Sequence, residues 1–228
     1  MQPDSLSVVI VAGGAGTRLG SPVPKAFVPL AGKPLFMHSL LQFSKHEAIG
    51  SIILVATPSM IEETRKLCES EDLSSRVTVV PSGKERWESV RNGVKAVQSE
   101  WVLVHDAARP FVTRVVIDAV LAQQDRYDCV ITVTPEVDTI RAYTDGRLMQ
   151  AIDRSRLVRV GTPQLFRVPK LIEAFAIVPT LNTLPTDEAV LMQAHSIDVG
   201  IAWGDPLNFK VTTPGDLTLA EALCAYRR

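Results

Sequence analysis

The sequence predicts an α/β protein with a Rossmann-like, doubly wound, mostly parallel mixed sheet. Short apolar runs alternate with segments of helical periodicity along most of the 228 residues, as in sheets covered by helices on both faces. The first run, residues 8–12, is a β-branched stretch that ends in glycines, which is typical of a strand buried on both faces. Polar clusters follow three of the expected strands, at residues 13–25, 82–86 and 105–110, where open α/β sheets bind ligands.

The length allows one large α/β domain or two small ones, and because no long linker appears we expect a single domain of residues 1–228. The composition excludes several function classes. Hydrophobic residues make up 46% of the chain and the formal net charge is −1, so a general nucleic-acid or membrane-surface binder is not expected. The three cysteines form no C-x-x-C pair, so neither a zinc site nor a disulfide framework is indicated. The N-terminus has no secretory pattern and no apolar run approaches the ~20 residues of a membrane span, so we expect a cytoplasmic protein.

The first part of the chain alternates regularly between strands and helices. After residues 8–12, strands are expected at 51–56, 77–80, 101–105 and 129–133. Helices are expected at 35–43 with Pro34 in the first turn, at 59–70, at 85–98, and at 115–123 with Thr113 as the cap. The third of these helices places Trp87, Val90, Val94 and Val97 on one face.

The alternation changes after Thr134. Residues 138–143 and 147–152 flank Asp145-Gly146, a dipeptide favoured in hairpin turns, so a β-ribbon arm is expected to protrude at about 136–156. Strands are then expected at 165–167, 197–203 and 209–211, and helices at 169–177, from Thr186, and after the Thr213 cap.

The glycine-rich loop after the first strand is expected to bind the phosphates of a nucleoside triphosphate. Backbone N–H groups of Ala12, Gly13, Gly14, Ala15 and Gly16, with the cations Arg18 and Lys25, are suited to a polyanion, although tight-turn geometry alone would also explain the glycines. The loop is not a P-loop, because no G-K-[ST] ends it. It also lacks the dinucleotide fingerprint, because Leu19 stands where the third glycine belongs.

Two later clusters carry the remaining candidates. Asp106 ends a buried strand near Arg109, where a carboxylate can hold Mg²⁺ against triphosphate oxygens or, alternatively, cap the next loop. His105 is expected to be a packed histidine rather than a catalyst. Gly83, Arg86 and Ser89 begin a helix and are candidates for contact with a base or ribose, the alternative being an ordinary helix start.

Together these motifs resemble one family. Residues 12–18, Ala-Gly-Gly-Ala-Gly-Thr-Arg, with Pro24-Lys25 beyond, resemble the signature of nucleotidyltransferases that make nucleoside-diphosphate sugars and alcohols. Gly83-x-x-Arg86-x-x-Ser89 and His-Asp-Ala-Ala-Arg-Pro at 105–110 narrow the resemblance to cytidylyltransferases. From residue 8 to about 222, the order resembles the 2-C-methyl-D-erythritol 4-phosphate cytidylyltransferase family of the non-mevalonate isoprenoid pathway. The motifs that complete it are Asp138-Thr139, Asp153-Arg154, Thr162-Pro163-Gln164, Thr186-Asp187-Glu188 and Asn208-Phe209-Lys210.

The resemblance implies a homodimer whose arm reaches into the partner's site, with CTP as substrate, Mg²⁺ as cofactor and pyrophosphate as product. It implies that Arg18 and Lys25 stabilise the triphosphate, and that Lys210 and the partner's Arg154 position the acceptor phosphate. Asp106 would hold Mg²⁺ and contact substrate. The other implied roles are acceptor binding by Arg109, Thr139 and Thr186, and cytidine binding by Gly83, Arg86 and Ser89.

Three alternatives stay open. A cytidylyltransferase for another polyol phosphate, such as ribitol 5-phosphate, would share nearly all of these motifs. A nicotinamide-dependent oxidoreductase would need an acidic residue after the second strand, where Thr57-Pro58 stands instead. A non-catalytic nucleotide-binding module would be expected to lose Lys25 or Asp106, and both are present.

Overall fold

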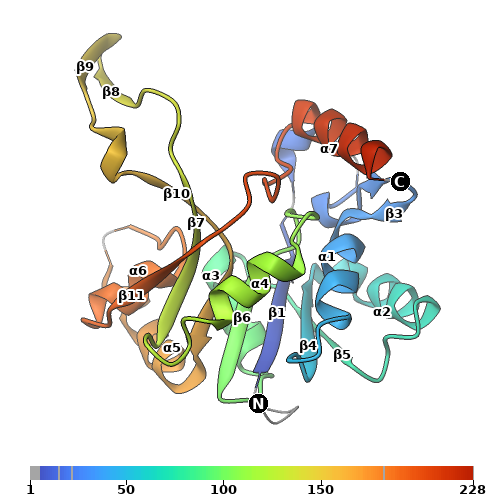
Figure 1. Cartoon of the computed structure of the whole chain (residues 1–228). Helices are drawn as coiled ribbons and strands as arrows, with labels where there is room; N and C mark the ends of the chain where they lie inside the picture. The colour runs from blue at the N-terminus through green and yellow to red at the C-terminus, as the bar shows by residue number, and fades with distance from the viewer. Residues whose placement is uncertain (1–5, 15, 22, 182, 228) are drawn as a thin grey trace.

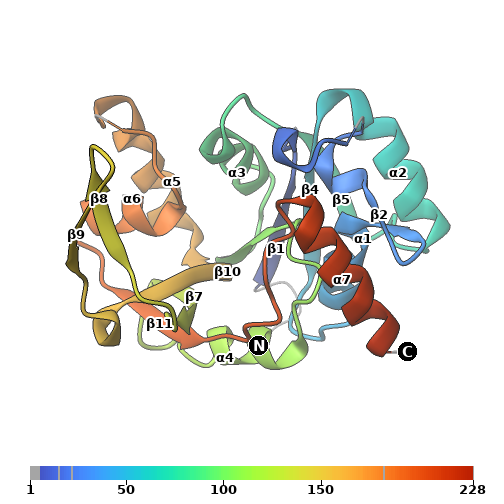
Figure 2. The same ribbon diagram turned by 90° about the horizontal axis from the view of Figure 1, so that it is seen from above.

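A computed structural model describes residues 6–14, 16–21, 23–181 and 183–227. These residues form a seven-stranded sheet with helices against both faces and an arm that leaves the body (Figures 1 and 2). Strand β10 is antiparallel to both of its neighbours, and the other pairs in the sheet are parallel, which confirms the predicted fold class. The spatial order is β11 (Val199–Trp203), β7 (Cys129–Pro135), β10 (Val158–Arg167), β6 (Trp101–Asp106), β1 (Leu6–Ala12), β4 (Ser51–Ala56) and β5 (Val77–Pro81).

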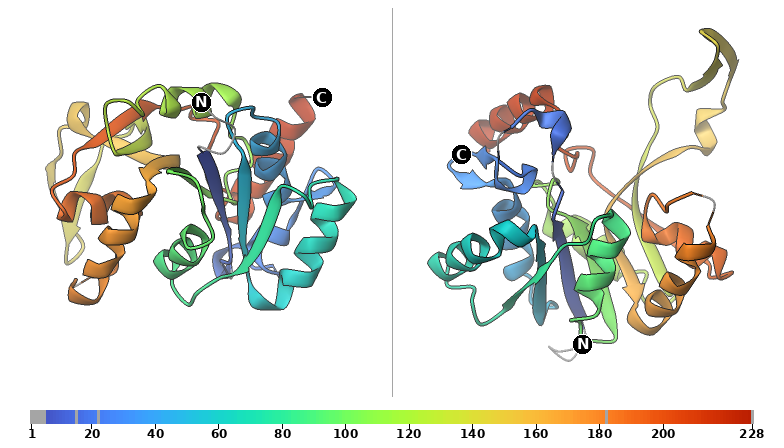
Figure 3. Two further views of the ribbon diagram at one scale, coloured as in Figure 1. Left: turned by 90° about the horizontal axis from the view of Figure 1, so that it is seen from below. Right: turned by 180° about the vertical axis from the view of Figure 1, so that it is seen from behind.

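The sheet is covered on both faces because successive strand residues point to opposite sides. In β1, Val8 and Ile10 join the apolar cluster beneath α1 (Leu35–Ser44), α2 (Ile61–Ser70) and α4 (Arg114–Leu121). Val9 points the other way and packs in the cluster with α3 (Arg86–Val94), α5 (Val168–Ala174) and α6 (Glu188–Ala194). The views from below and behind show both layers (Figure 3).

The predicted arm is present. Strands β8 (Arg141–Thr144) and β9 (Arg147–Ala151) are fully exposed and joined by Asp145 and Gly146, whose φ angles of 50° and 77° match a type I′ turn. Figure 1 shows the hairpin standing away from the sheet, at the end of extensions from β7 and β10. The chain then returns to the body through β10.

Two strand predictions need correction. The strand expected at 165–167 is the end of β10, which is ten residues long and shifts its register between Val160 and Gln164. Residues 209–211 do not form a strand. Instead, Phe209 packs on Phe111 with ring centroids 5.5 Å apart, and the Val211 N–H donates to the Ala108 carbonyl.

Several boundaries and one element also differ. Helix α3 ends at Val94 rather than 98, because Ala96 and Val97 make tighter three-residue turn bonds. Helix α6 begins at Glu188, since the Asp187 carboxylate, not Thr186, caps it by accepting from Val190. A short hairpin, β2 (Pro29–Leu30) and β3 (Lys33–Pro34), was not predicted. Pro34 occupies the N-cap position of α1, without a capping side chain, instead of lying in the first turn.

The last helix, α7 (Pro214–Tyr226), starts as predicted with Thr213 in a capping box with Asp216. It packs by Ala220 against a small cluster that includes Leu19, Leu30 and Phe111, and so covers the loop that follows β1. Within the described residues, none of the helices combines the length and the apolar character that crossing a membrane requires.

Candidate functional site

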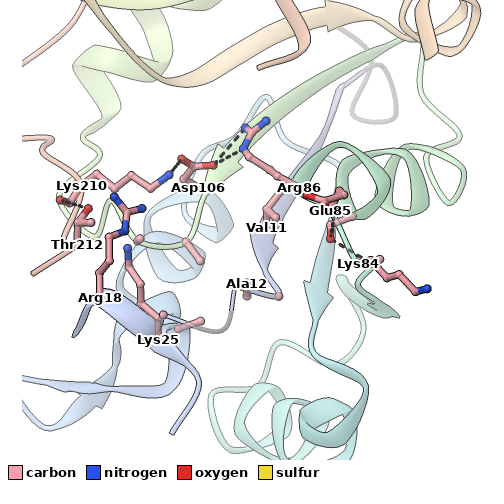
Figure 4. Close-up of a pocket in the computed structure, with 18 residues that line it drawn as sticks. Val11, Ala12, Arg18, Lys25, Lys84, Glu85, Arg86, Asp106, Lys210 and Thr212 are labelled. Carbon is pink, nitrogen blue, oxygen red and sulfur yellow. Dashed lines mark hydrogen bonds and ion pairs between the residues drawn. The ribbon is translucent and has the colours of Figure 1, made fainter. Parts of the chain in front are cut away.

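A cavity of about 350 Å³ opens at the carboxyl ends of β1 and β6. Four segments distant in the sequence meet there, as expected for ligand sites of open α/β sheets (Figure 4). They are the glycine loop with Arg18 and Lys25, the residues at the start of α3, the end of β6 with Asp106, and the segment with Lys210 and Thr212.

The glycines let the loop approach its neighbours closely. Gly16 has a φ of +69°, and a Cβ placed on it would lie 2.3 Å from the Cβ of Lys25. A Cβ on Gly13 would lie 2.2 Å from that of Ser82. The loop backbone and Lys25 therefore take their positions because these residues lack side chains. Ala12, Gly13, Gly14 and Gly16 line the cavity, and Ala15 lies outside the described residues.

The two predicted triphosphate-binding cations point into this cavity, where Lys210 also converges on Asp106 (Figure 4). Arg18 lies on the short helical turn Thr17–Leu19, and Lys25 begins the turn Lys25–Phe27. Burial, reinforced by the nearby charge of Lys210, lowers the pKa of Lys25 to about 8. Within the described part of the chain, neither Arg18 nor Lys25 has a carboxylate in ion-pair range.

Asp106 is the centre of a buried charge network. Lys210 Nζ donates to Oδ2 at 2.6 Å, and Arg86 Nε and Nη2 donate to Oδ1 at 3.2 Å. Burial opposes ionisation of Asp106, but Arg86 and Lys210 outweigh it and hold its pKa well below the usual range. The other side of Arg86 binds Glu188, because Nη1 donates to both of its carboxylate oxygens at 2.8 Å.

The start of α3 is a capped helix terminus that also borders the cavity. Gly83 N–H donates to Ser89 Oγ at 3.1 Å, while the Lys84 and Glu85 N–H groups donate to the Glu88 carboxylate. The ordinary helix-start interpretation therefore describes these contacts. Gly83, Arg86 and Ser89 still face the cavity, so their predicted contact with cytidine stays a prediction.

Four other predicted residues lie elsewhere. Arg109 donates to the carbonyls of Asn208 and Val160 and lines a neighbouring cavity of about 390 Å³, which Lys210 also borders. Thr186 is exposed before α6. Thr139 and Arg154 are exposed on the arm, where Arg154 Nη1 donates to the Val137 carbonyl at 2.5 Å. The chain's own fold does not bring Thr139, Arg154 or Thr186 to the cavity.

Sequence reasoning missed Glu188 as a partner of the site. The sequence places it favourably for the dipole of α6, yet its side chain is buried, and burial raises its pKa against the opposing charge of Arg86. A carboxylate directly before Ala189, Val190 and Leu191 is the one signal that could have indicated a buried partner. His105 is packed as expected, between Thr162 Oγ1 and the Arg109 carbonyl, and burial lowers its pKa to about 4.

Comparisons with known proteins find relatives that resemble this chain along nearly its whole length. Residues 6–225 match the family model described as 2-C-methyl-D-erythritol 4-phosphate cytidylyltransferase, IspD. A protein of that name from Bacteroides thetaiotaomicron is 38% identical over 218 residues, which are 95% of this chain and 98% of that protein. One from Bacillus licheniformis is 37% identical, over 95% of this chain and 94% of that protein. The crystal structure of the Thermus thermophilus protein of that name has a TM-score of 0.82 at 31% identity, covering 97% of this chain and 99% of the other.

Proposed function

The chain belongs to the 2-C-methyl-D-erythritol 4-phosphate cytidylyltransferase family, and we propose that it transfers CMP from CTP to 2-C-methyl-D-erythritol 4-phosphate. The products are 4-diphosphocytidyl-2-C-methyl-D-erythritol and pyrophosphate. The observation that carries the proposal is the convergence of Arg18, Lys25 and Lys210 on the cavity beside Asp106. The proposal includes the cytoplasmic location that the sequence predicts.

The reaction joins two polyanions, so its main obstacle is electrostatic repulsion. An oxygen of the acceptor phosphate attacks the α-phosphorus of CTP and forms a new P–O bond. The bond from that phosphorus to the oxygen bridging to the β-phosphate breaks, and pyrophosphate leaves with the electron pair. The acceptor is already an anion, so the step needs no general base. Fixed cations therefore supply the catalysis, by positioning the reactants and stabilising charge.

Arg18 and Lys25 are assigned to the triphosphate. They enter the cavity from the loop after β1 without carboxylate partners among the described residues, so their charge is available to a ligand. Charge develops on the oxygens of the α-phosphate and the leaving pyrophosphate as the bond breaks. A donor aimed at such an oxygen lowers the barrier by roughly 2.7–4 kcal/mol.

The acceptor is assigned to Lys210 and to residues that the partner subunit supplies. Arg154 and Thr139 are exposed and do not line the cavity of their own chain. The hairpin of the arm stands away from the body (Figure 1). The strands of that arm expose Tyr143, Leu148 and Met149, and an isolated two-stranded hairpin is marginally stable in water. We therefore propose a homodimer in which each arm completes the partner's site.

Mg²⁺ is assigned to Asp106. Mg²⁺ keeps several waters and takes one or two carboxylates together with substrate phosphates, so one ionised carboxylate at the cavity fits it. Asp106 is held ionised, and one of its oxygens is bound only through the flexible Lys210 side chain. Among the described residues no cluster of three or more metal-ligating side chains occurs, which is consistent with a site completed by CTP. The ion would neutralise triphosphate charge there.

Incubation of the protein with CTP, Mg²⁺ and each candidate acceptor tests the proposal. Pyrophosphate release should be fast with 2-C-methyl-D-erythritol 4-phosphate and slow with ribitol 5-phosphate at the same concentration. Omitting the acceptor controls for CTP hydrolysis. A preference for ribitol 5-phosphate would contradict the acceptor, and CTP binding without turnover on any polyol phosphate would contradict the enzyme activity itself.

A further inference from the structure

Glu188 does not line the cavity, yet it holds a residue that does. It is the first residue of α6, and its side chain is 1% exposed. Both of its carboxylate oxygens accept hydrogen bonds from Arg86 Nη1 at 2.8 Å. A buried carboxylate is therefore committed to one arginine that reaches forward into the site.

Arg86 transmits this contact to Asp106. Its Nε and Nη2 donate to Asp106 Oδ1 at 3.2 Å, while Nη1 stays on Glu188. A guanidinium is planar and rigid, so anchoring Nη1 sets the plane in which the other two nitrogens meet their acceptor. The position of the Asp106 carboxylate consequently depends on Glu188, two contacts away.

The chain of ion pairs continues from Asp106 to Lys210, the residue proposed to bind the acceptor phosphate. Glu188, Arg86, Asp106 and Lys210 alternate in charge, and Lys210 Nζ binds Asp106 Oδ2 at 2.6 Å. The side chains of Glu188 and Asp106 are 1% and 11% exposed, whereas that of Lys210 is 38% exposed. The network therefore runs from the interior to the cavity, with its most exposed end, Lys210, on the substrate side.

A contribution to folding stability does not by itself explain why a carboxylate is buried at position 188. Desolvation of a buried ion pair often offsets its Coulomb energy, and apolar residues of similar size commonly stabilise as well or better. The neighbours Ala189, Leu191 and Met192 already bury the apolar face of α6. The charge of Glu188, the first residue of α6, is better explained by its orientation of Arg86.

We infer that Glu188 is a positioning residue for cytidylyl transfer, which through Arg86 fixes the Asp106 carboxylate and Lys210 at the edge of the cavity. This inference rests on the proposed function. It adds to the site a residue that touches neither substrate and that lies on a different helix from the residue it orients.

Glu188→Gln tests the inference, because it keeps the size of the side chain and removes its charge. We expect kcat to fall ten- to hundredfold, as for a misplacement of about 1 Å at a reacting centre, while the Kd for CTP from calorimetry stays within about threefold. In an Asp106→Asn background the same substitution should change kcat less than about threefold, because its route to the reaction is already removed.

Asp187→Ala is the matched control. It removes the N-cap of the same helix, where the Asp187 carboxylate accepts from Val190 at 3.2 Å, and leaves the Arg86 contact in place. Chemical denaturation should show lower stability for Asp187→Ala, with kcat within about threefold of wild type. If the wild type is active, any of three results would overturn the inference. They are a wild-type kcat in Glu188→Gln, effects of Glu188→Gln and Asp106→Asn that simply add, and a loss of kcat in Asp187→Ala equal to that in Glu188→Gln. An inactive wild type would instead contradict the proposed function, and this inference with it.

Discussion

The pKa of Lys25 gives the sharpest prediction about how the site works. It lies at about 8 in the free protein, because burial and the charge of Lys210 disfavour the ammonium form. Lys25 is therefore charged below pH 8 and neutral above it. A neutral amine offers little to a triphosphate, so kcat/KM for CTP should fall as the pH rises through 8. At pH 9 only about a tenth of the free enzyme carries the charge, so the loss relative to pH 7 should be roughly tenfold.

The same reasoning predicts how the complex differs from the free enzyme. Bound triphosphate favours the charged form of Lys25 and raises its pKa, so the alkaline limb of kcat should lie at higher pH than that of kcat/KM. Substrate phosphate groups lose their last proton near pH 6, below this range, so they do not produce the limb. Initial rates of pyrophosphate release from pH 6.5 to 10, with CTP varied at a saturating acceptor concentration, measure both profiles.

The variant Lys25→Arg tests whether Lys25 is the group whose deprotonation produces the alkaline limb. A guanidinium stays protonated throughout this range, so the variant should lose the limb near pH 8 even if its rate is lower because the geometry differs. Lys170→Arg, at an exposed position on α5, makes the same chemical change away from the cavity and should keep the wild-type profile. A limb that persists at pH 8 in Lys25→Arg would refute the reasoning, since another group would then carry it.

Four further outcomes follow from the arrangement of the site. Arg18→Ala should lower kcat about 10²–10³-fold and weaken CTP binding less, by steady-state kinetics and calorimetry; full activity would remove its role. Gly16→Ala should also lower kcat, because its Cβ would lie 2.3 Å from that of Lys25 on a backbone with φ of +69°, and a circular dichroism spectrum like that of the wild type would show that the fold remains. Lys210→Ala and Arg154→Ala should each reduce kcat/KM for the acceptor more than for CTP, and an unchanged acceptor value would count against them. Mixed dimers of Arg18→Ala and Arg154→Ala subunits should regain activity through one intact site, whereas no recovery would mean that each arm serves its own subunit.

The sequence was sufficient for the parts of the fold that depend on local pattern. The β-branched run of β1, the Asp145-Gly146 turn and the Thr213 cap each specify a conformation through nearby residues, and each is present. The sequence pattern did not predict the extent of elements that tertiary contacts determine. Strand β10 shifts register between Val160 and Gln164, which interrupts the period of two, so the sequence indicated only its last residues.

The candidate site was predictable in residue type but not in pairing. Cations after β1 and a carboxylate at the end of β6 follow from the strand-end rule. The strand-end rule does not predict which cation pairs with which carboxylate. Arg86 and Glu188 are 102 residues apart in sequence, and Lys210 and Asp106 are 104 apart. Arg86 lines the cavity, as expected of a nucleotide-binding residue, and its guanidinium also binds two carboxylates that the sequence did not pair with it.

The ion pair between Lys210 and Asp106 divides the cations of the cavity into two groups with different proposed roles. Neither Arg18 nor Lys25 forms an ion pair with a carboxylate among the described residues, and burial, with a further contribution from the charge of Lys210, lowers the pKa of Lys25. Lys210 is already satisfied by Asp106, so an arriving acceptor phosphate must compete with that carboxylate for its ammonium group. We expect CTP to be held first by Arg18 and Lys25, and the acceptor phosphate to bind Lys210 only where it displaces the Asp106 carboxylate from the ammonium group. Asp106 would hold Mg²⁺, which would supply positive charge to the triphosphate, so this one carboxylate lies between the groups proposed for the two substrates.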